Sequence, residues 1–251
     1  MAITIKSERE IELMAEAGKI LERVHNELEK ALHPGMSTKD IDTLGEEIIR
    51  SYGCIPSFLN YNGYPASICV SVNQEVVHGI PDKHRIIHEG DIVSLDAGVI
   101  YKGYHSDAAR THAVGEVSEE AKKLIQVTKE CFFEGIKYAK AGNHLFDISG
   151  AIGRYAEERG YGVVRDLCGH GIGTALHEAP EIPNYEVGRK GVKLRPGMTL
   201  AIEPMINIGT YEVDWLDDDW TVVTEDGSLA AHYENTIVIT EDGCEILTLS
   251  E

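Results

Sequence analysis

The sequence predicts an α+β fold in which two related halves share a curved antiparallel sheet, with the helices on one face of the sheet. Three observations predict it: each half of the chain begins with a pair of amphipathic helices, short β-rich runs follow each pair, and the two halves align at a single offset. We expect a single domain over residues 1–251, with pseudo-symmetric halves of about 1–117 and 118–251.

The first helix pair is marked by its ends. Ser7 and Glu10 have the spacing of a capping box, and apolar residues then recur at the helical period. The segment 33–35 (HPG) breaks this helix. A second helix starts after Ser37 and is closed by Gly53, because glycine favours the left-handed conformation that ends many helices.

The order of helix, break and helix returns in residues 118–160. The two helix pairs match when the second is shifted by 107 positions, and the same shift aligns GDIVSLD (90–96) with GMTLAIE (197–203). Asp96 therefore falls opposite Glu203. One offset that holds over two separated blocks indicates an internal repeat.

Between and after the helix pairs, the sequence is typical of strands. The runs ICVSV (68–72), DIVSL (91–95) and TIVIT (236–240) are β-rich and bounded by turn residues. YKGY (101–104) and EDGS (225–228) predict hairpin turns. We expect these strands to form one antiparallel sheet that curves around a central cleft.

Composition disfavours several classes of function. The formal net charge of −19 opposes direct nucleic-acid specificity and attachment to an anionic membrane, because like charges repel. No stretch approaches the roughly 20 apolar residues of a membrane span, and residues 1–14 lack the apolar run of a signal peptide. The five cysteines are scattered, without Cys-x-x-Cys spacing, which suits a reducing compartment. We therefore expect a cytoplasmic protein.

Two acids in the first half are expected to face each other. A hairpin centred near 101–102 would set Asp96 and Asp107 nearly opposite on one face of the sheet. Cross-strand Cβ atoms lie roughly 5 Å apart, and like charges at that distance repel. A cation or a raised pKa must offset this repulsion.

The second half supplies further metal-ligand candidates. Glu203 and Glu234 also lie in strand-like apolar segments, and His170 lies in a glycine-rich loop. Several carboxylates with one imidazole suit Mn²⁺, Fe²⁺, Co²⁺ or Zn²⁺, and bridging carboxylates can hold two ions about 3.5–4 Å apart. This donor set accepts several metals, so it does not select one.

The ordered set of these five residues is shared with a known family. With the segments NQEVVHGIP (73–81), CGHGIG (168–173), LHEAP (176–180) and AIEPMINIG (201–209), the sequence resembles the M24 metallopeptidases of the pita-bread fold, and most closely the type I methionine aminopeptidases. The resemblance implies two divalent ions, of cobalt, manganese, iron, zinc or nickel.

The resemblance also implies a role for each of the five residues. Asp96 would bind one ion, and His170 and Glu203 the other, while Asp107 and Glu234 would bridge the two. A metal-bound hydroxide would attack the first peptide bond, and Glu203 would also carry a proton to the leaving amine.

Two more histidines and an apolar pocket follow from the same resemblance. His177 would hydrogen-bond the scissile peptide or its developing oxyanion, and His78 would hold the substrate backbone on the opposite side. The first side chain would enter an apolar methionine pocket, formed by Tyr61, Tyr64, Cys69, Leu176 and Trp220. The family pattern further implies a monovalent-cation site near Asn73, Glu75 and Ala230.

Spacing favours the short, bacterial-style type I subtype. His177 and Glu203 are 26 residues apart, and Glu203 and Glu234 are 31 apart, which leaves no room for the helical insertion of the type II enzymes. The implied function is removal of the initiator methionine from nascent proteins, with preference for a small second residue. We expect a monomer that meets nascent N-termini through transient contact with the ribosome.

Three alternatives remain open. Aminopeptidase P and prolidase share the five ligands but carry a large N-terminal domain, whereas about 50–60 residues precede the pocket segment of this chain. A binding module that keeps the fold would typically lose metal ligands, and all five are present. A mononuclear oxygenase that uses two histidines and one carboxylate fits four acids and one histidine poorly.

Overall fold

Four α-helices of the described chain lie where the sequence predicts them. The structure, a computed structural model, describes residues 3–249, and residues 1–2 and 250–251, at the ends of the expected domain, lie outside the described residues. Ser7 caps the first helix in a capping box with Glu10, and Gly53, after the second helix, has a φ of +72°. The helices are α1 (Glu8–Ala31), α2 (Thr38–Ser51), α3 (Glu119–Ile136) and α4 (Leu145–Glu157).

Strands from both halves of the chain form one nine-stranded antiparallel sheet. Its paired order is β1-β4-β5-β14-β9-β7-β8, with β2 beside β4 and β15 beside β14. The bounds are β1 (Ile55–Pro56), β2 (Ile68–Val72), β4 (Ile92–Tyr101), β5 (Tyr104–Ala113), β7 (Gly169–Gly171), β8 (Glu178–Ile182), β9 (Thr199–Ile202), β14 (Glu234–Ile239) and β15 (Cys244–Ile246).

Two smaller sheets complete the described strands. In one, β10 (Met205–Asn207) lies between β13 (Ala230–His232) and β6 (Gly162–Val163). In the other, β12 (Val222–Thr224) lies between β11 (Val213–Trp215) and β3 (Glu75–Val77).

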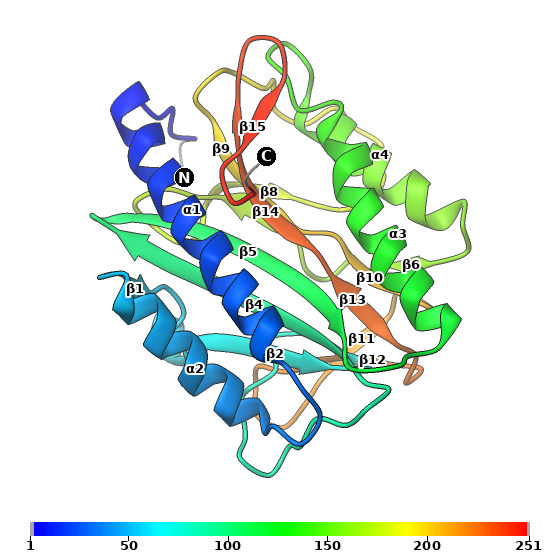
Figure 1. Ribbon diagram of the computed structural model, residues 1–251. Helices are drawn as coiled ribbons and strands as arrows, with labels where there is room; N and C mark the ends of the chain where they lie inside the picture. The colour runs from blue at the N-terminus through cyan, green and yellow to red at the C-terminus, as the bar shows by residue number, and fades with distance from the viewer. Residues whose placement is uncertain (1–2, 250–251) are drawn as a thin grey trace.

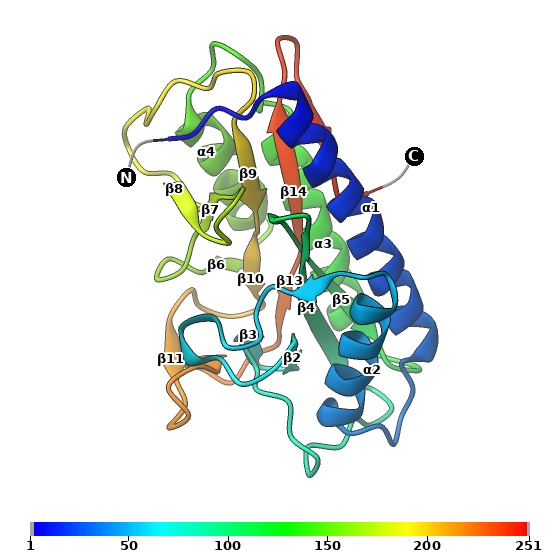
Figure 2. The same cartoon turned by 90° about the vertical axis from the view of Figure 1, so that its left-hand side faces the viewer.

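The internal repeat appears in the centre of the large sheet. The strands that the repeat aligns, β4 and β9, lie on either side of the central pair β5 and β14. Each half buries its own apolar cluster between its helix pair and its strands. The helices α1 and α2 pack on β2, β4 and β5, and α3 and α4 pack against the strands of the second half (Figures 1 and 2).

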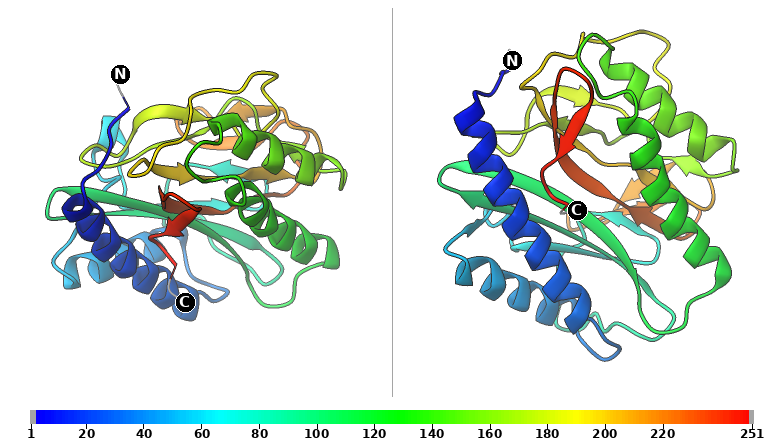
Figure 3. Two further views of the ribbon diagram at one scale, coloured as in Figure 1. Left: turned by 90° about the horizontal axis from the view of Figure 1, so that it is seen from above. Right: turned by 45° about the horizontal axis from the view of Figure 1, so that its top comes forward.

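The last strand closes the helical side of the molecule. Figures 1 and 3 show β15 in the space between α1 and α3. Gly18 of α1 is needed there, because a Cβ at this position would lie only 1.9 Å from the carbonyl oxygen of Leu247. Within residues 3–249, no helix combines the length and the apolarity that crossing a membrane requires.

The two predicted hairpin turns have different outcomes. Lys102 and Gly103 join β4 to β5 in a two-residue turn with positive φ at both positions, 49° and 86°. The hairpin predicted at 225–228 is wrong. The chain turns there, but β12 pairs with β11 and β3 whereas β13 pairs with β10, so this turn joins two different sheets.

Candidate metal centre

The five candidate ligands, far apart in the sequence, line one cavity of about 370 Å³. They are Asp96 on β4, Asp107 on β5, His170 on β7, Glu203 directly after β9 and Glu234 at the start of β14. The strand order brings these elements together in the middle of the sheet, because β5, β14, β9 and β7 are consecutive neighbours.

Strand register decides how the acids face one another. Asp96 pairs with Ala109, and Ala109 also pairs with Glu234, so these residues form one row across three strands. Asp107 pairs with Gly98, two positions from Asp96. The expectation that Asp96 and Asp107 lie nearly opposite is therefore corrected: the turn is centred on 102–103, and the two acids are diagonal neighbours on the same face.

His170 turns one ring nitrogen towards the acids. Its Nδ1 lies 2.9 Å from the carbonyl oxygen of Gly171 and donates to it, which leaves the lone pair of Nε2 free to bind a cation. Nε2 lies 3.6 Å from Oε1 of Glu203 and 3.9 Å from Oδ2 of Asp107. Ligand atoms of Asp107, His170 and Glu234 all lie within 4.8 Å of one another.

Burial makes this concentration of charge costly. Burial raises the pKa of Asp96 to about 7, and burial together with the neighbouring acids raises the pKa values of Asp107 and Glu234 well above the ordinary range. Burial also lowers the pKa of His170 to about 3, so its imidazole is neutral and able to act as a ligand.

The donor set fits a divalent cation. Three buried carboxylate oxygens, Oδ1 of Asp96, Oδ1 of Asp107 and Oε1 of Glu234, have no hydrogen-bond partner among the described residues. Unpaired buried carboxylates are expensive unless they are protonated or bind a cation. Carboxylates with one neutral imidazole are typical ligands of first-row divalent metals.

His177 is held at the edge of this cavity by two rings. Its Nδ1 lies 2.8 Å from the hydroxyl oxygen of Tyr61, and the two rings are stacked with centroids 5.2 Å apart. On the other side, its ring centroid lies 4.1 Å from that of His170. His177 therefore stands beside the candidate ligands with Nε2 available to a bound molecule.

His78 lies on another wall of the same cavity. Its backbone has a φ of +59°, a conformation that non-glycine residues rarely adopt. Its ring centroid lies 6.3 Å from that of Trp220, and the two rings are nearly perpendicular. Burial lowers the pKa of His78 to about 4. His78 is thus neutral near pH 7 and able to donate or accept a hydrogen bond.

An apolar pocket adjoins the acids. All five residues predicted for it line the cavity, namely Tyr61, Tyr64, Cys69, Leu176 and Trp220. Cys69 on β2 pairs with Asp96 on β4, which brings the pocket and the acids together. Phe58 and Asn62 line it as well and were not predicted. Their closeness to Tyr61 in the sequence could have indicated that they belong to the same wall.

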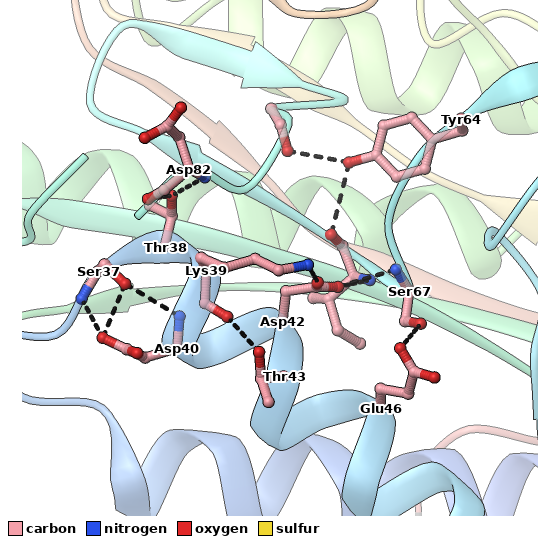
Figure 4. Close-up of polar contacts among 12 residues, drawn as sticks. Ser37, Thr38, Lys39, Asp40, Asp42, Thr43, Glu46, Tyr64, Ser67 and Asp82 are labelled. Carbon is pink, nitrogen blue, oxygen red and sulfur yellow. Dashed lines mark hydrogen bonds and ion pairs between the residues drawn. The ribbon is translucent and has the colours of Figure 1, made fainter. Parts of the chain in front are cut away.

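A polar network holds the pocket wall in place (Figure 4). The buried Asp42 of α2 accepts hydrogen bonds from the backbone N–H groups of Ser67 and Ile68, at 2.8 and 3.0 Å, where β2 begins. The hydroxyl of Tyr64 donates to the carbonyl oxygen of Gly79 at 3.0 Å. The other carboxylate oxygen of Asp42 accepts from Nζ of Lys39 at 2.6 Å. No sequence motif pointed to Asp42, because the groups that it joins to α2 are backbone N–H groups 25 and 26 residues away.

His232 is a second residue that the sequence did not reveal. It is buried on β13, and its Nε2 lies 3.7 Å from Oε2 of Glu203. Its position two residues before Glu234 was the only available signal. Burial lowers its pKa to about 3, so it contacts Glu203 as a neutral ring.

Known proteins are similar to this chain in sequence and in fold. The sequence matches metallopeptidase family M24 over residues 12–241. It is 60% identical to the methionine aminopeptidase of Clostridium acetobutylicum, over 99% of this chain and 100% of that protein. The structure of the methionine aminopeptidase from Thermotoga maritima superposes with a TM-score of 0.97 at 48% identity, covering 99% of this chain and 100% of the other.

A proline-specific enzyme is less similar. The Xaa-Pro dipeptidase of Bacillus anthracis is 29% identical, with a TM-score of 0.79. The match covers 98% of this chain but 62% of that one.

Proposed function

The chain belongs to metallopeptidase family M24, and from this premise we propose that it removes the N-terminal methionine from nascent proteins and peptides. The reaction is hydrolysis of the first peptide bond by a metal-dependent aminopeptidase. One observation carries the proposal: four acids, of which Asp96, Asp107 and Glu234 are buried and Glu203 is 14% exposed, share a cavity with a neutral imidazole and a pocket of aromatic, sulfur and aliphatic side chains. Such a pocket suits the flexible, polarizable side chain of methionine.

The five ligands would hold two divalent ions. Asp96 would bind one, His170 and Glu203 the other, and Asp107 and Glu234 both. When bound, the ions supply Lewis acidity and lower the pKa of water towards neutrality. Family membership and the buried donor set support divalent metal use. The number of ions and their identity, among cobalt, manganese, iron, zinc and nickel, belong to the proposal.

Three residues act on the peptide itself. His177 donates from Nε2 to the scissile carbonyl oxygen, since its Nδ1 is engaged by the hydroxyl of Tyr61. His78 holds the substrate backbone from the other wall. Glu203 moves a proton to the leaving amine, and its carboxylate contacts His170 and His232 at 3.6 and 3.7 Å.

Substrate choice follows from the size of the cavity. Methionine fills the pocket of Tyr61, Tyr64, Cys69, Leu176 and Trp220, and it shares about 370 Å³ with the reacting bond. The space that remains favours a small second residue. A monovalent cation near Asn73, Glu75 and Ala230 stays a prediction.

The cellular setting is part of the same proposal. The whole chain acts as a single catalytic domain and as a monomer in the cytoplasm, where nascent N-termini emerge. Its net charge of −19 opposes broad attachment to RNA, so contact with the ribosome is transient.

The test compares peptides under one set of conditions. Purified protein with Mn²⁺ or Co²⁺ is incubated with Met-Gly-Met-Met and with an Xaa-Pro peptide, and released amino acids are measured by chromatography. We expect methionine release from the first peptide only. Preference for the Xaa-Pro peptide would indicate a proline-specific enzyme, and no release from metal-loaded protein would indicate a binding module.

Three variants assign the roles. Asp107→Ala should lose both metal binding and turnover, and Glu203→Gln should lose most turnover. His177→Ala should bind metal normally and yet lose kcat by about 100-fold or more, as expected for a donor that stabilises developing negative charge. Turnover equal to wild type in Asp107→Ala or Glu203→Gln would refute the assignment.

A further inference from the structure

A buried ion pair ties the N-terminal segment to the loop that carries His177. Nζ of Lys6 lies 2.6 Å from Oε2 of Glu178, and the two side chains are only 5% and 12% exposed. Glu178 follows His177 directly and begins β8. Neither Lys6 nor Glu178 lines the cavity of the metal ligands, so the proposed reaction does not use them directly.

The carboxylate of Glu178 also forms a hydrogen bond within its own loop. Besides Lys6, it accepts hydrogen bonds from the backbone N–H of Ala175, at 3.3 Å, and from the hydroxyl of Thr4. Burial opposes its ionisation, yet the hydrogen bonds from Lys6 and Thr4 outweigh burial and lower its pKa. The Glu178 carboxylate is therefore charged near neutral pH.

Gly173 makes room for the lysine. A Cβ at this position would lie 2.4 Å from Cε of Lys6 and 2.5 Å from Oε1 of Glu178, so any side chain here would displace the ends of this ion pair. The glycine in the motif GHGIG thus lets the lysine side chain pass against the loop. Its carbonyl oxygen also accepts a hydrogen bond from the backbone N–H of His105 at 2.8 Å, which fixes the start of the loop on β5.

The lysine is itself anchored. Its backbone N–H donates to the carbonyl oxygen of Gly197 at 2.8 Å, just before β9, and the next residue, Ser7, caps α1. Lys6 therefore connects the loop of His177 to the strand that leads to Glu203. Because the backbone of Lys6 is fixed and its side chain is buried, its ion pair restrains the loop more than an exposed ion pair would.

We propose that Lys6 is a positioning residue for His177: its ion pair with Glu178 holds loop 173–178 so that the imidazole stays over the reacting bond. This inference rests on the proposed function, because it takes His177 to contact the scissile carbonyl. A misplacement of about 1 Å can cost about 100-fold in rate, so loss of the pair lowers kcat although no reacting group changes.

The test uses Lys6→Met, Glu178→Gln and the double variant, with Arg9→Met as the matched control. Arg9, three residues after Lys6, forms an ion pair with Glu12 at the start of α1, but the two side chains are 71% and 65% exposed. We measure kcat and KM on Met-Gly-Met-Met, Mn²⁺ affinity by calorimetry, and hydrogen exchange of the amides of 174–178. Glu178→Gln keeps an acceptor for Ala175 and carries the test if Lys6→Met does not fold.

We expect Lys6→Met to lower kcat by about 10-fold or more with KM and Mn²⁺ affinity within about threefold, and to speed exchange in 174–178. The double variant should lose no more kcat than Lys6→Met, because both changes break one interaction. Arg9→Met should match wild type. Wild-type kcat in Lys6→Met, or a parallel loss of Mn²⁺ affinity, would overturn the inference. A wild-type protein that releases no methionine would instead overturn the proposed function. The exchange measurement would then still test whether the ion pair of Lys6 and Glu178 holds the loop.

Discussion

A single hydrogen bond decides which nitrogen of His177 faces the cavity. The hydroxyl oxygen of Tyr61 lies 2.8 Å from Nδ1, so Nε2 is the nitrogen left for the cavity. In the tautomer that the proposed function requires, the proton is on Nε2 and the hydroxyl donates to Nδ1. Tyr61 was predicted as a wall of the methionine pocket, and its ring does line the cavity. Its hydroxyl adds a second role that the residue type alone did not indicate.

Tyr61→Phe should separate the two roles of Tyr61. The phenyl ring keeps the apolar wall and the stacking on His177, so KM should stay within about twofold. Without the hydrogen bond, the tautomer of His177 is no longer fixed, and kcat should fall by about 10-fold, the effect of roughly 1.4 kcal/mol. Steady-state kinetics on Met-Gly-Met-Met measures both constants.

The matched control is Tyr155→Phe, which removes a hydroxyl that donates to Glu130 on the helical side of the molecule. It should leave both constants unchanged. A change in KM with unaltered kcat in Tyr61→Phe would show that the hydroxyl serves only the pocket.

At the scale of elements, the ends of the helices could be predicted from the sequence more accurately than the register of the strands. Helix ends followed the capping signals at Ser7 and Gly53, which are local and therefore readable. Register was harder, because moving the turn by one residue, to 102–103, changes every cross-strand pair and makes Asp96 and Asp107 diagonal neighbours. The face that the acids share was still predictable, since it depends only on the two-residue period of a strand.

The contact between α2 and β2 gives a prediction for stability. Asp42 accepts two backbone N–H groups at the start of β2, and its carboxylate is buried. Asp42→Ala leaves both donors buried without a partner, so the free energy of unfolding should fall by about 3 kcal/mol. Asp42→Asn keeps an acceptor oxygen and should cost about 1 kcal/mol.

Urea unfolding of the metal-free protein, followed by tryptophan fluorescence, measures this difference. Glu46→Gln is the control, because Glu46 accepts only the hydroxyl of Ser67 in this network and is a third exposed. It should change the free energy of unfolding by less than about 0.5 kcal/mol. Equal stability of Asp42→Ala and Asp42→Asn would show that the hydrogen bonds from Ser67 and Ile68 do not contribute to stability.

At the scale of the whole molecule, the repeat explains why so much of the site could be predicted. One offset placed Asp96 opposite Glu203, and the sheet sets their strands, β4 and β9, on either side of its central pair. His232 and the pair of Lys6 and Glu178 could not be predicted, because each depends on a contact between segments with no shared pattern. Long-range polar contacts of this kind become visible only in the folded chain.

The charge collected at the centre makes the stability of the whole molecule depend on pH and metal. In metal-free protein, burial raises the pKa of Asp96 to about 7 and raises those of Asp107, Glu203 and Glu234 well above the ordinary range. Groups with a raised pKa in the folded state bind more protons there than in the unfolded chain. The stability they contribute is complete below the unfolded pKa, near 4, and is lost as pH rises through the folded pKa.

The buried histidines change the stability with pH in the opposite direction, but they do so at lower pH than the acids. Burial lowers the pKa values of His170 and His232 to about 3. Their contribution to stability grows as pH rises to about 6.5, the unfolded value, and is constant above it. Between pH 7 and about 8.5, the acids therefore decide how the free energy of unfolding changes with pH.

We expect the Tm of EDTA-treated protein to fall by at least about 5 °C from pH 7 to pH 8.5, and Mn²⁺ to restore it most strongly at the higher pH, because metal binds the deprotonated ligands. Differential scanning fluorimetry measures both. In Asp107→Asn the decline should be shallower, since one buried acid no longer ionises and its neighbours lose a like charge. A Tm of the metal-free protein that rises over this range would mean that the acids are not gathered in one buried centre, because dispersed carboxylates are already ionised at pH 7 and add no such slope.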